Sequence, residues 1–260
     1  MPITAPRNEF KRRLLADETL YGLWMMSVSP VLAEAASLLG YDWMLFDSEH
    51  SPVEVSGLQP LMQAAAGGTS ALLARPAWND QVLIKRVLDI GAQTLVVPFV
   101  QSAEEAAAAV QWTRYPPRGQ RGVSAATRAG RYGLAADYFQ VANDEICLLV
   151  QVETRAAIDR IGEIAAVDGV DGVFIGPSDL AASLGRIGNP GHEEVQAVLR
   201  ASVEPIVSSG KSPGILATGP ETARRYADWG YRFIGVTTDL AVFAGGARKV
   251  LADVSASRHR

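Results

Sequence analysis

The sequence predicts a single (β/α)8 barrel over residues 1–260, and three observations lead to that prediction. The chain of 260 residues fits the roughly 250 residues of a typical barrel of this kind. Eight short apolar runs recur along it, and eight helical stretches alternate with them. Alternating strand and helix units of this number are typical of a parallel sheet closed into a TIM barrel.

The apolar runs are predicted strands because their hydrophobic residues are nearly continuous. Strands that are covered on both faces show this pattern, whereas half-exposed strands alternate with polar residues. The predicted strands cover residues 21–26, 43–47, 71–76, 94–100, 147–153, 172–176, 213–217 and 233–239.

The stretches between the strands have helical periodicity, and several close with glycine near the expected C-cap. The predicted helices cover residues 31–40, 57–68, 80–91, 103–114, 156–169, 193–210, 221–230 and 240–254. One irregular segment, rich in Gly and Arg, is inserted before the fifth strand at about 115–143. Long insertions of this kind are usually functional or disordered. Its arginines are expected either to meet a substrate carboxylate or, the preferred alternative, to be solvated or to face a neighbouring subunit: Arg118, Arg121, Arg128 and Arg131.

The composition excludes several classes of partner. The 24 basic and 28 acidic residues give a net charge of −4 and are scattered, so no basic stripe is available to neutralise a nucleic-acid backbone. No apolar run reaches the roughly 20 residues of a membrane span, and the first residues lack the apolar core of a signal peptide. We therefore expect a cytoplasmic protein.

The single cysteine, Cys147, lies in an apolar run and is predicted to be a small core residue.

The ends of the predicted strands carry the candidate site, because barrel enzymes assemble their active sites at the C-terminal ends of the strands. Any one of these polar residues could also cap the following helix. Together they would place one positive and several negative groups at the same mouth. The residues at or just after strand ends are Asp47, Glu49, His50, Arg75, Gln151, Glu153, Asp179, Leu216 and Asp239.

Glu153 and Asp179 lie one βα unit apart, so they are predicted to be neighbours at the same rim. Two carboxylates in that position repel one another unless a cation joins them. Oxygen ligands favour a hard divalent metal, Mg²⁺ or Mn²⁺, with Co²⁺ as another possibility. The alternative is a carboxylate pair used directly in acid and base chemistry, as in glycosidases.

Lysine and histidine positions narrow the chemistry further. None of the four lysines, Lys11, Lys85, Lys211 and Lys249, ends a predicted strand, which argues against a Schiff-base aldolase. Of the three histidines, only His50 follows a strand end. His192 begins a predicted helix and His259 lies near the C-terminus, and both are expected to be exposed.

Five blocks of sequence carry a family resemblance, and the match as a whole runs from about Tyr21 to Leu251. They are "GLWMMSVSPVLAEAASLLGYDWMLFDSEHSP", "VLDIGAQTLVVPFV", "RYPPRGQRGVS", "LLVQVET" and "DGVFIGPSDLAASLG". The chain thereby resembles the HpcH/HpaI family of class II pyruvate aldolases. That resemblance implies a barrel of the phosphoenolpyruvate/pyruvate superfamily, with no organic cofactor. It also implies a homo-oligomer, a hexamer built as a dimer of trimers, whose last helix is exchanged between subunits.

The resemblance also implies roles for individual residues. Glu153 and Asp179 match the metal ligands, and His50 matches the base. Arg75 matches the arginine that stabilises the enolate, and Asp47 matches a supporting carboxylate. Four positions match the pyruvate-binding site: Gln151, Gly176, Pro177 and Ser178. Trp24 and Leu216 are expected to line the acceptor pocket, although either could be an ordinary core residue.

Asp89 raises a geometric question, because a helix that follows the third strand ends at the opposite end of the barrel from the mouth. The resemblance implies that the corresponding acid reaches the histidine of an adjacent subunit and raises its basicity. The alternative is an aspartate that only caps or solvates its own turn.

The implied activity is reversible cleavage of a 4-hydroxy-2-oxo acid to an aldehyde and pyruvate, or a substituted pyruvate such as hydroxypyruvate. Two other functions remain open at this point. One is a lyase of the same superfamily that acts on a CoA thioester, of the citryl-CoA or malyl-CoA type. The other is a barrel that binds an acid metabolite without catalysis.

Overall fold

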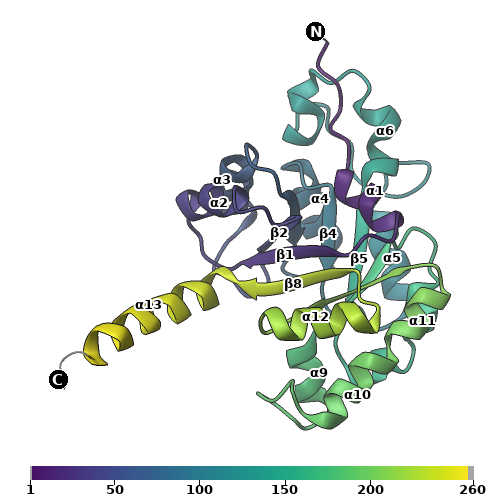
Figure 1. Cartoon of the computed structure of the whole chain (residues 1–260). Helices are drawn as coiled ribbons and strands as arrows, with labels where there is room; N and C mark the ends of the chain where they lie inside the picture. The colour runs from purple at the N-terminus through teal and green to yellow at the C-terminus, as the bar shows by residue number, and fades with distance from the viewer. Residues whose placement is uncertain (1, 257–260) are drawn as a thin grey trace.

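The computed structural model describes residues 2–256 and shows eight parallel strands closed into a barrel in sequence order (Figure 1). Each strand pairs with the next along the chain, and β8 returns to pair with β1. The predicted (β/α)8 barrel is confirmed. The strands are β1 (Leu20–Met25), β2 (Trp43–Asp47), β3 (Ala71–Arg75), β4 (Thr94–Val97), β5 (Cys147–Val152), β6 (Gly172–Ile175), β7 (Ser212–Leu216) and β8 (Phe233–Thr238).

Helices surround the strands and include several that the sequence pattern did not predict (Figure 1). They are α1 (Glu9–Leu15), α2 (Pro30–Ser37), α3 (Val55–Ala65), α4 (Gln81–Asp89), α5 (Ala103–Thr113), α6 (Tyr138–Glu145), α7 (Arg155–Ile158), α8 (Ile161–Ala165), α9 (Pro177–Ser183), α10 (Glu193–Ala201), α11 (Val203–Ser208), α12 (Pro220–Trp229) and α13 (Asp239–Ser255), with a 3-10 helix, η1 (Arg128–Gly133).

Several details of the helix prediction were wrong. The helices α1, α6 and α9 lie outside the predicted helices, and α6 occupies the end of the segment predicted to be irregular. Two stretches predicted as single helices each form two: 156–169 forms α7 and α8, and 193–210 forms α10 and α11, separated at Ser202. Pro205, in the first turn of α11, has no N–H to bond the carbonyl of Ala201 and so interrupts a continuous helix there.

The barrel interior is filled by side chains from alternate strand positions, since successive strand residues point to opposite faces. Trp43 and Phe233 fill much of the space, and Phe10 of α1 meets both rings edge-on, with centroids 6.5 Å and 6.4 Å away. A Cβ on Gly22 would lie 2.0 Å from the Trp43 ring, so only glycine fits beside that ring. Helix α1 therefore closes the N-terminal end of the barrel, which we call the base.

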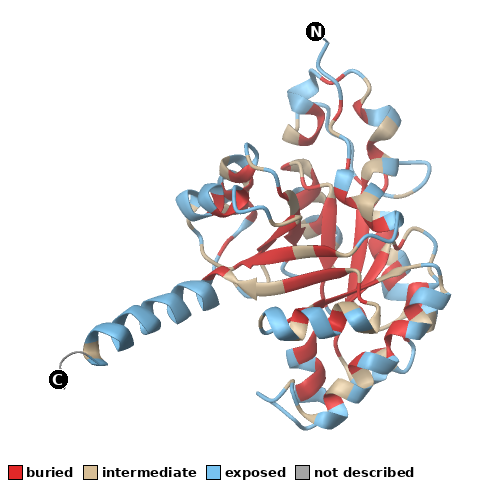
Figure 2. Cartoon of the chain, in the orientation of Figure 1, coloured by how far each residue is buried: buried red, intermediate tan, exposed pale blue. Residues whose placement is uncertain are grey.

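A second apolar layer lies between the outer faces of the strands and the surrounding helices, as the burial pattern in Figure 2 shows.

Cys147, at the start of β5, is fully buried, which confirms its prediction as a core residue. Burial raises the pKa of its thiol well above the ordinary value, so the thiolate is disfavoured.

Helix α13 departs from this packing and extends away from the barrel (Figures 1 and 2). From Leu240 onward its residues are almost all exposed, and several of them are large and apolar: Leu240, Val242, Phe243, Val250, Leu251 and Val254. None of the helices described between residues 2 and 256 is long and apolar enough to cross a membrane.

Candidate active site

The upper layer of the barrel interior is polar, and the alternation of strand residues explains why. Asp47, Arg75 and Gln151 each come two positions after a buried interior leucine. They therefore point into the barrel just above the apolar core. The C-terminal ends of the strands, which we call the mouth, bring these three side chains together.

Arg75 and Asp47 form a two-pronged ion pair across β3 and β2. Arg75 Nε donates to Asp47 Oδ1 over 2.9 Å, and Arg75 Nη2 donates to Asp47 Oδ2 over 2.5 Å. The Trp24 indole N–H also donates to Asp47 Oδ2, over 3.2 Å, and the guanidinium lies 4.8 Å from the centre of the Trp24 ring. Burial alone would raise the pKa of Asp47, but Arg75, the Glu49 backbone N–H and Trp24 together hold it below the ordinary value.

A hydrogen-bonded chain continues from Arg75 to Glu153. Arg75 Nη1 donates to Gln151 Oε1 over 3.3 Å, and Gln151 Nε2 donates to Glu153 Oε2 over 2.5 Å. The other carboxylate oxygen, Glu153 Oε1, accepts the backbone N–H of Phe99 over 3.0 Å. Each oxygen keeps a further lone pair beyond these bonds. The carboxylate is thus fixed in orientation and still able to bind a cation.

Glu49 and His50 follow β2 and lie at the rim of the mouth. Glu49 Oε2 is 2.8 Å from Arg75 Nη1, although the angle is not that of a hydrogen bond, and it is 4.0 Å from His50 Nε2. The His50 side chain is 58% exposed, so a substrate that enters the mouth from solvent can contact the imidazole. Asp47 supports this turn by accepting the backbone N–H groups of Glu49 and His50, and it makes no bond to the imidazole.

The mouth carries more negative than positive charge. The pKa of Glu153 is raised to about 7: burial is the largest cause, Glu49 and Asp179 act in the same direction, and the hydrogen bonds from Gln151 and Phe99 act against it. Burial likewise raises the pKa of Glu49, with Asp47 and Asp179 acting in the same direction and Arg75 against it. Carboxylates in such surroundings favour either a bound proton or a bound cation.

Glu153 and Asp179 are the residues that fit a divalent metal. Helix α9 presents Asp179 in its first turn, and Gly176, just before it, leaves the space in which a Cβ would come within 2.6 Å of Glu153 Oε2. Among residues 2–256, no cluster of three or more His, Cys, Asp or Glu side chains is arranged to hold a metal by itself. A metal at this pair would need further oxygen ligands from water or substrate, as open catalytic sites do.

A pocket of about 340 Å³ occupies the mouth and contains most of the predicted site residues. Gln151 and Glu153 connect to its wall through Arg75 and Gly176. The pocket also contains three residues that the sequence analysis did not single out: Met26, Phe174 and Thr238. The full lining of the pocket is Trp24, Met26, Asp47, His50, Arg75, Phe174, Gly176, Pro177, Ser178, Asp179, Leu216 and Thr238.

The two apolar candidates differ in their surroundings. Trp24 is only 2% exposed and packs on Phe174, with ring centroids 5.3 Å apart, so it belongs to both the core and the pocket wall. Leu216 is half-buried at the end of β7. Asp239 faces away from this chemistry: its carboxylate accepts the backbone N–H groups of Met26 and Ser27 and ties the end of β8 to the end of β1.

Asp89 lies at the base of its own barrel and not at the mouth, in agreement with the geometric prediction. It ends α4 at the base, where Arg121 Nη2 donates to Asp89 Oδ1 over 2.9 Å. The Arg121 side chain is 1% exposed, lies 4.4 Å from the centre of the Tyr115 ring and also donates to the Tyr138 hydroxyl. The preferred expectation of a solvated or intersubunit role was therefore wrong for Arg121, because it is an internal partner of Asp89.

The remaining arginines of the insertion also lie away from the mouth pocket. Arg118 pairs with Asp144 of α6, and Arg128 donates to the carbonyl of Ile90 at the end of α4. None of the insertion's arginines lines the mouth pocket among the residues the structure describes. The expected contact with a substrate carboxylate has no support in this chain's own mouth.

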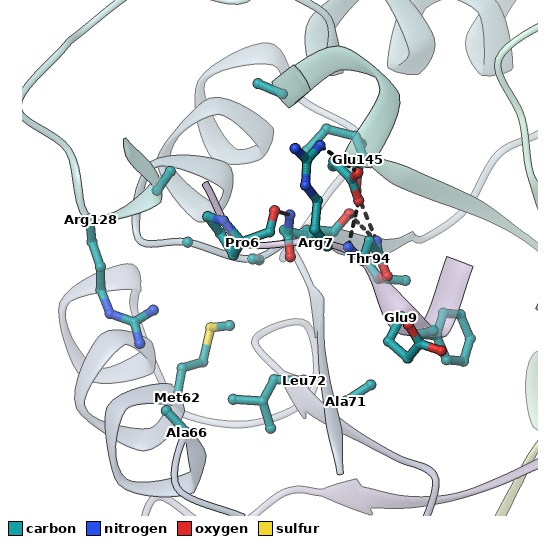
Figure 3. A pocket seen from close by; sticks show the side chains of 18 of the residues that line it. Pro6, Arg7, Glu9, Met62, Ala66, Ala71, Leu72, Thr94, Arg128 and Glu145 are labelled. Carbon is teal, nitrogen blue, oxygen red and sulfur yellow. Dashed lines mark hydrogen bonds and ion pairs between the residues drawn. The ribbon is translucent and has the colours of Figure 1, made fainter. Parts of the chain in front are cut away.

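A second cavity, of about 420 Å³, lies at the base and is larger than the mouth pocket (Figure 3). The starts of β3 and β4 line it, with Met62 and Leu72 on an apolar side and Arg7 and Glu145 on the opposite side. Glu145 accepts hydrogen bonds from the Arg7 side chain and from the Asn8 backbone. These charges pair with one another and hold the N-terminal segment in place.

The other histidines and the lysines stay outside the site. His192 is half-buried and not exposed as predicted, because its Nδ1 accepts the N–H of Glu194 and caps α10. His259 lies outside the described residues. All four lysines are described, and none of them lines the mouth pocket.

Comparisons with known proteins agree with this architecture. Residues 20–245 match the profile of the family described as HpcH/HpaI aldolase/citrate lyase. A pyruvate aldolase of Rhizobium etli is 49% identical over 95% of this chain and 97% of its own length. A 4-hydroxy-2-oxo-heptane-1,7-dioate aldolase of Klebsiella pneumoniae is 48% identical over 94% and 93%. The crystal structure of an HpcH/HpaI aldolase/citrate lyase family protein from Burkholderia cenocepacia J2315 superposes with a TM-score of 0.93 and 38% identity, over 95% of this chain and 99% of that one.

Proposed function

The chain belongs to the HpcH/HpaI aldolase/citrate lyase family and is a carbon–carbon lyase, and from this premise we propose that it is a divalent-metal-dependent pyruvate aldolase. Its proposed reaction is the reversible cleavage of a 4-hydroxy-2-oxo acid to an aldehyde and pyruvate, or a substituted pyruvate. The observation that carries the proposal is the chain of hydrogen bonds from Arg75 through Gln151 to Glu153, with Asp179 beside it in the same mouth.

The metal would be held by Glu153 and Asp179, with Mg²⁺ or Mn²⁺ as the proposed ion and Co²⁺ as a substitute. When bound, it would supply a Lewis acid that stabilises negative charge on the 2-oxo oxygen of the substrate. The excess of carboxylates and the raised pKa of Glu153 support this proposal, because a cation relieves their repulsion.

Arg75 is the proposed stabiliser of the enolate. A guanidinium is always protonated at working pH, so it serves as a fixed positive charge and not as a base. Arg75 Nε and Nη2 both donate to Asp47, and the third nitrogen, Nη1, faces Gln151 and Glu49. A charge held in advance at the position where negative charge develops costs no reorganisation during the reaction.

His50 is the proposed base, with Glu49 as its neighbour in the same chain. In the cleavage direction, His50 accepts the proton of the C4 hydroxyl as the C3–C4 bond breaks. The bonding electrons pass to the 2-oxo oxygen and form the enolate beside Arg75. Protonation of the enolate at C3 then yields pyruvate, while C4 leaves as the aldehyde carbon.

The pocket wall would receive the carbon skeletons. Gln151 and the turn from Gly176 to Ser178 are proposed to bind the pyruvate part, since they lie next to Glu153 and Asp179. Trp24 and Leu216 are proposed to line the acceptor side, which Met26 and Thr238 share. A panel of aldehydes, assayed with pyruvate and with hydroxypyruvate, would identify the acceptor and test hydroxypyruvate as a donor.

We also propose a homohexamer, built as a dimer of trimers, in which α13 is exchanged between subunits. The exposed apolar residues of α13 support this, because an isolated amphipathic helix extended into solvent gains little stability by itself. In such an assembly Asp89 is proposed to approach the His50 of an adjacent subunit.

The two other candidate functions are less well supported. A CoA thioester would need cations for its phosphates, yet among residues 2–256 Arg75 is the only arginine that lines the mouth pocket, and it is already paired with Asp47. A barrel that only binds an acid does not agree with the aldolases among its relatives.

The decisive experiment measures pyruvate release from 4-hydroxy-2-oxo-heptane-1,7-dioate, coupled to lactate dehydrogenase and NADH. We expect turnover that EDTA abolishes and that Mg²⁺, Mn²⁺ or Co²⁺ restores. Full turnover in EDTA would contradict the metal assignment. Absence of pyruvate from a panel of 4-hydroxy-2-oxo acids, with every metal tested, would contradict the aldolase assignment.

A further inference from the structure

Phe99 has an unusual backbone conformation immediately beside the proposed metal site. Its φ is +53°, in the left-handed region that residues other than glycine rarely adopt. It follows β4, and the preceding Pro98 ends that strand. A strained residue of this kind persists only where its surroundings impose the conformation.

The conformation has one direct result for the site. It turns the backbone N–H of Phe99 toward Glu153 Oε1, over 3.0 Å. The next residue returns to the sheet, since the N–H of Val100 donates to the carbonyl of Gln151 over 2.9 Å. The chain therefore makes a local bulge above β5 that delivers one N–H to the Glu153 carboxylate.

The Phe99 side chain stacks on Trp78. The two ring centroids are 5.2 Å apart and the planes differ by 27°. Both rings are partly in solvent, with Phe99 38% and Trp78 49% exposed, so this pair is not part of the buried core. Trp78 lies in the loop that follows Arg75, the last residue of β3, so the stack joins the loops that follow β3 and β4.

We propose that Phe99 is a positioning residue for Glu153, and that its stack on Trp78 holds the left-handed backbone that directs the N–H to the carboxylate. The proposal rests on the proposed function, because it takes Glu153 as a metal ligand. Partners that orient a ligating carboxylate commonly change metal affinity when they are lost. Phe99 and Trp78 would thus act on the metal site without touching the substrate.

The test uses Mn²⁺ alone and measures its dissociation constant by electron paramagnetic resonance of the free ion, without substrate. Phe99→Ala removes the ring and keeps the Cβ that disfavours a positive φ, and it should weaken Mn²⁺ binding by about tenfold. Phe99→Gly also removes the ring but adopts the left-handed conformation freely, so it should bind Mn²⁺ within about threefold of the wild type. A residue that acts only through packing would show the opposite order, with glycine worse than alanine.

Trp78→Ala provides a second route to the same effect in case a Phe99 variant folds poorly, which circular dichroism would reveal. It should weaken Mn²⁺ binding severalfold, whereas Trp78→Ala combined with Phe99→Gly should match Phe99→Gly alone. Tyr132 is a matched control, because it is also an exposed aromatic residue with a positive φ, of 58°, but lies in the insertion. Tyr132→Ala and Tyr132→Gly should leave Mn²⁺ affinity unchanged.

The outcomes separate the two proposals. Wild-type protein that binds no Mn²⁺, or a Glu153→Gln variant that binds it as well as the wild type, would overturn the metal assignment and this inference together. Tight wild-type binding that Phe99→Ala leaves unchanged would overturn this inference alone. Weak binding by Phe99→Ala with recovery in Phe99→Gly would establish Phe99 as the residue that orients Glu153.

Discussion

Two buried arginines, Arg75 at the mouth and Arg121 at the base, have similar partners and different surroundings. Each guanidinium bonds to an aspartate, Asp47 or Asp89, and each lies over an aromatic ring, Trp24 at 4.8 Å or Tyr115 at 4.4 Å. Judged by these contacts alone, either pair could be a structural ion pair or the centre of a functional site.

The charge around each pair distinguishes them. At the base, Arg121 meets one carboxylate, Asp89, and otherwise neutral tyrosines, so the positive and negative charges balance. At the mouth, Arg75 neutralises Asp47, while the neighbouring carboxylates raise the pKa of Glu153 and of Glu49. A surplus of carboxylates around the buried Glu153 is costly without a cation. A group of charges that do not balance therefore indicates a binding site better than an ion pair whose two charges balance.

Removing one of the surplus carboxylates should have the largest effect on activity. Glu153→Gln keeps the shape of the side chain and loses its charge, so metal affinity and transition-state stabilisation should both be lost. We expect kcat/KM to fall by at least about 10³-fold, the equivalent of about 4 kcal/mol. Pyruvate release measures this change, and a loss below about tenfold would contradict the role of Glu153.

The two arginines should respond differently to the same conservative change. Arg75→Lys keeps the charge but cannot hold Asp47 with two nitrogens and reach Gln151 with a third. We expect kcat/KM to fall by about 10²- to 10³-fold, the range seen when one oxyanion donor is removed. If kcat/KM were nearly unchanged while stability fell, Arg75 would be a structural residue like Arg121.

The surplus charge should also make the metal-free protein sensitive to pH. The pKa of Glu153 is raised from 4.5 to about 7 in the folded protein, so the folded state holds a proton that the unfolded chain has already released. The resulting stability is fully present below about pH 4.5 and is lost as the pH rises through 7, a change on the order of 3 kcal/mol. Urea unfolding in EDTA at pH 5.5 and 8.5 should detect about 2 kcal/mol of this change, and Mn²⁺ should restore stability at pH 8.5. Glu153→Gln is the control, and an equally steep pH dependence in that variant would assign the effect to other groups.

Breaking the balanced pair at the base should lower stability. Arg121→Met leaves Asp89 without its partner and removes the contact with Tyr115. We expect the free energy of unfolding to fall by about 2 kcal/mol, less than the 3 to 5 kcal/mol of a fully buried pair because Asp89 is 23% exposed. A lower urea midpoint would show this effect, and an unchanged midpoint would contradict a structural role for the pair.

Asp89→Asn should have the smallest effect and tests whether the base is purely structural. If Asp89 approaches the His50 of an adjacent subunit, its loss removes a charge that supports the proposed base. The value of kcat/KM should then fall by about tenfold at most. A kcat/KM equal to that of the wild type would limit Asp89 to its bond with Arg121.

The fold was predictable because the signals that specify it are local. Eight near-continuous apolar runs and the helices between them determined the barrel and the places of its strands. The helices that were missed have weaker local signals. Helix α1 becomes necessary only when a barrel exists whose base must be closed by Phe10. The break between α10 and α11 at Ser202 did have a local signal, Pro205, which the prediction of one continuous helix overlooked.

The candidate site was predictable in part, for the same reason. Residues at strand ends converge in any closed parallel barrel, so Asp47, Arg75, Glu153 and Asp179 could be grouped from their positions alone. Glu49 had only its place between Asp47 and His50 to suggest a role. Phe99 had no polar side chain to attract attention, because it contributes through its backbone N–H.

The sequence by itself determined the barrel, the order of its strands and which polar side chains face the mouth, because alternation along a strand and convergence of strand ends follow from backbone geometry. Only the tertiary structure decided which charges pair and which stay in surplus. It matched Arg75 with Asp47 and Arg121 with Asp89, and it left Glu153 beside Glu49 and Asp179. These partners come from different βα units, and the energy of a charge depends on its distance from every other charge and on its burial, which no local pattern records.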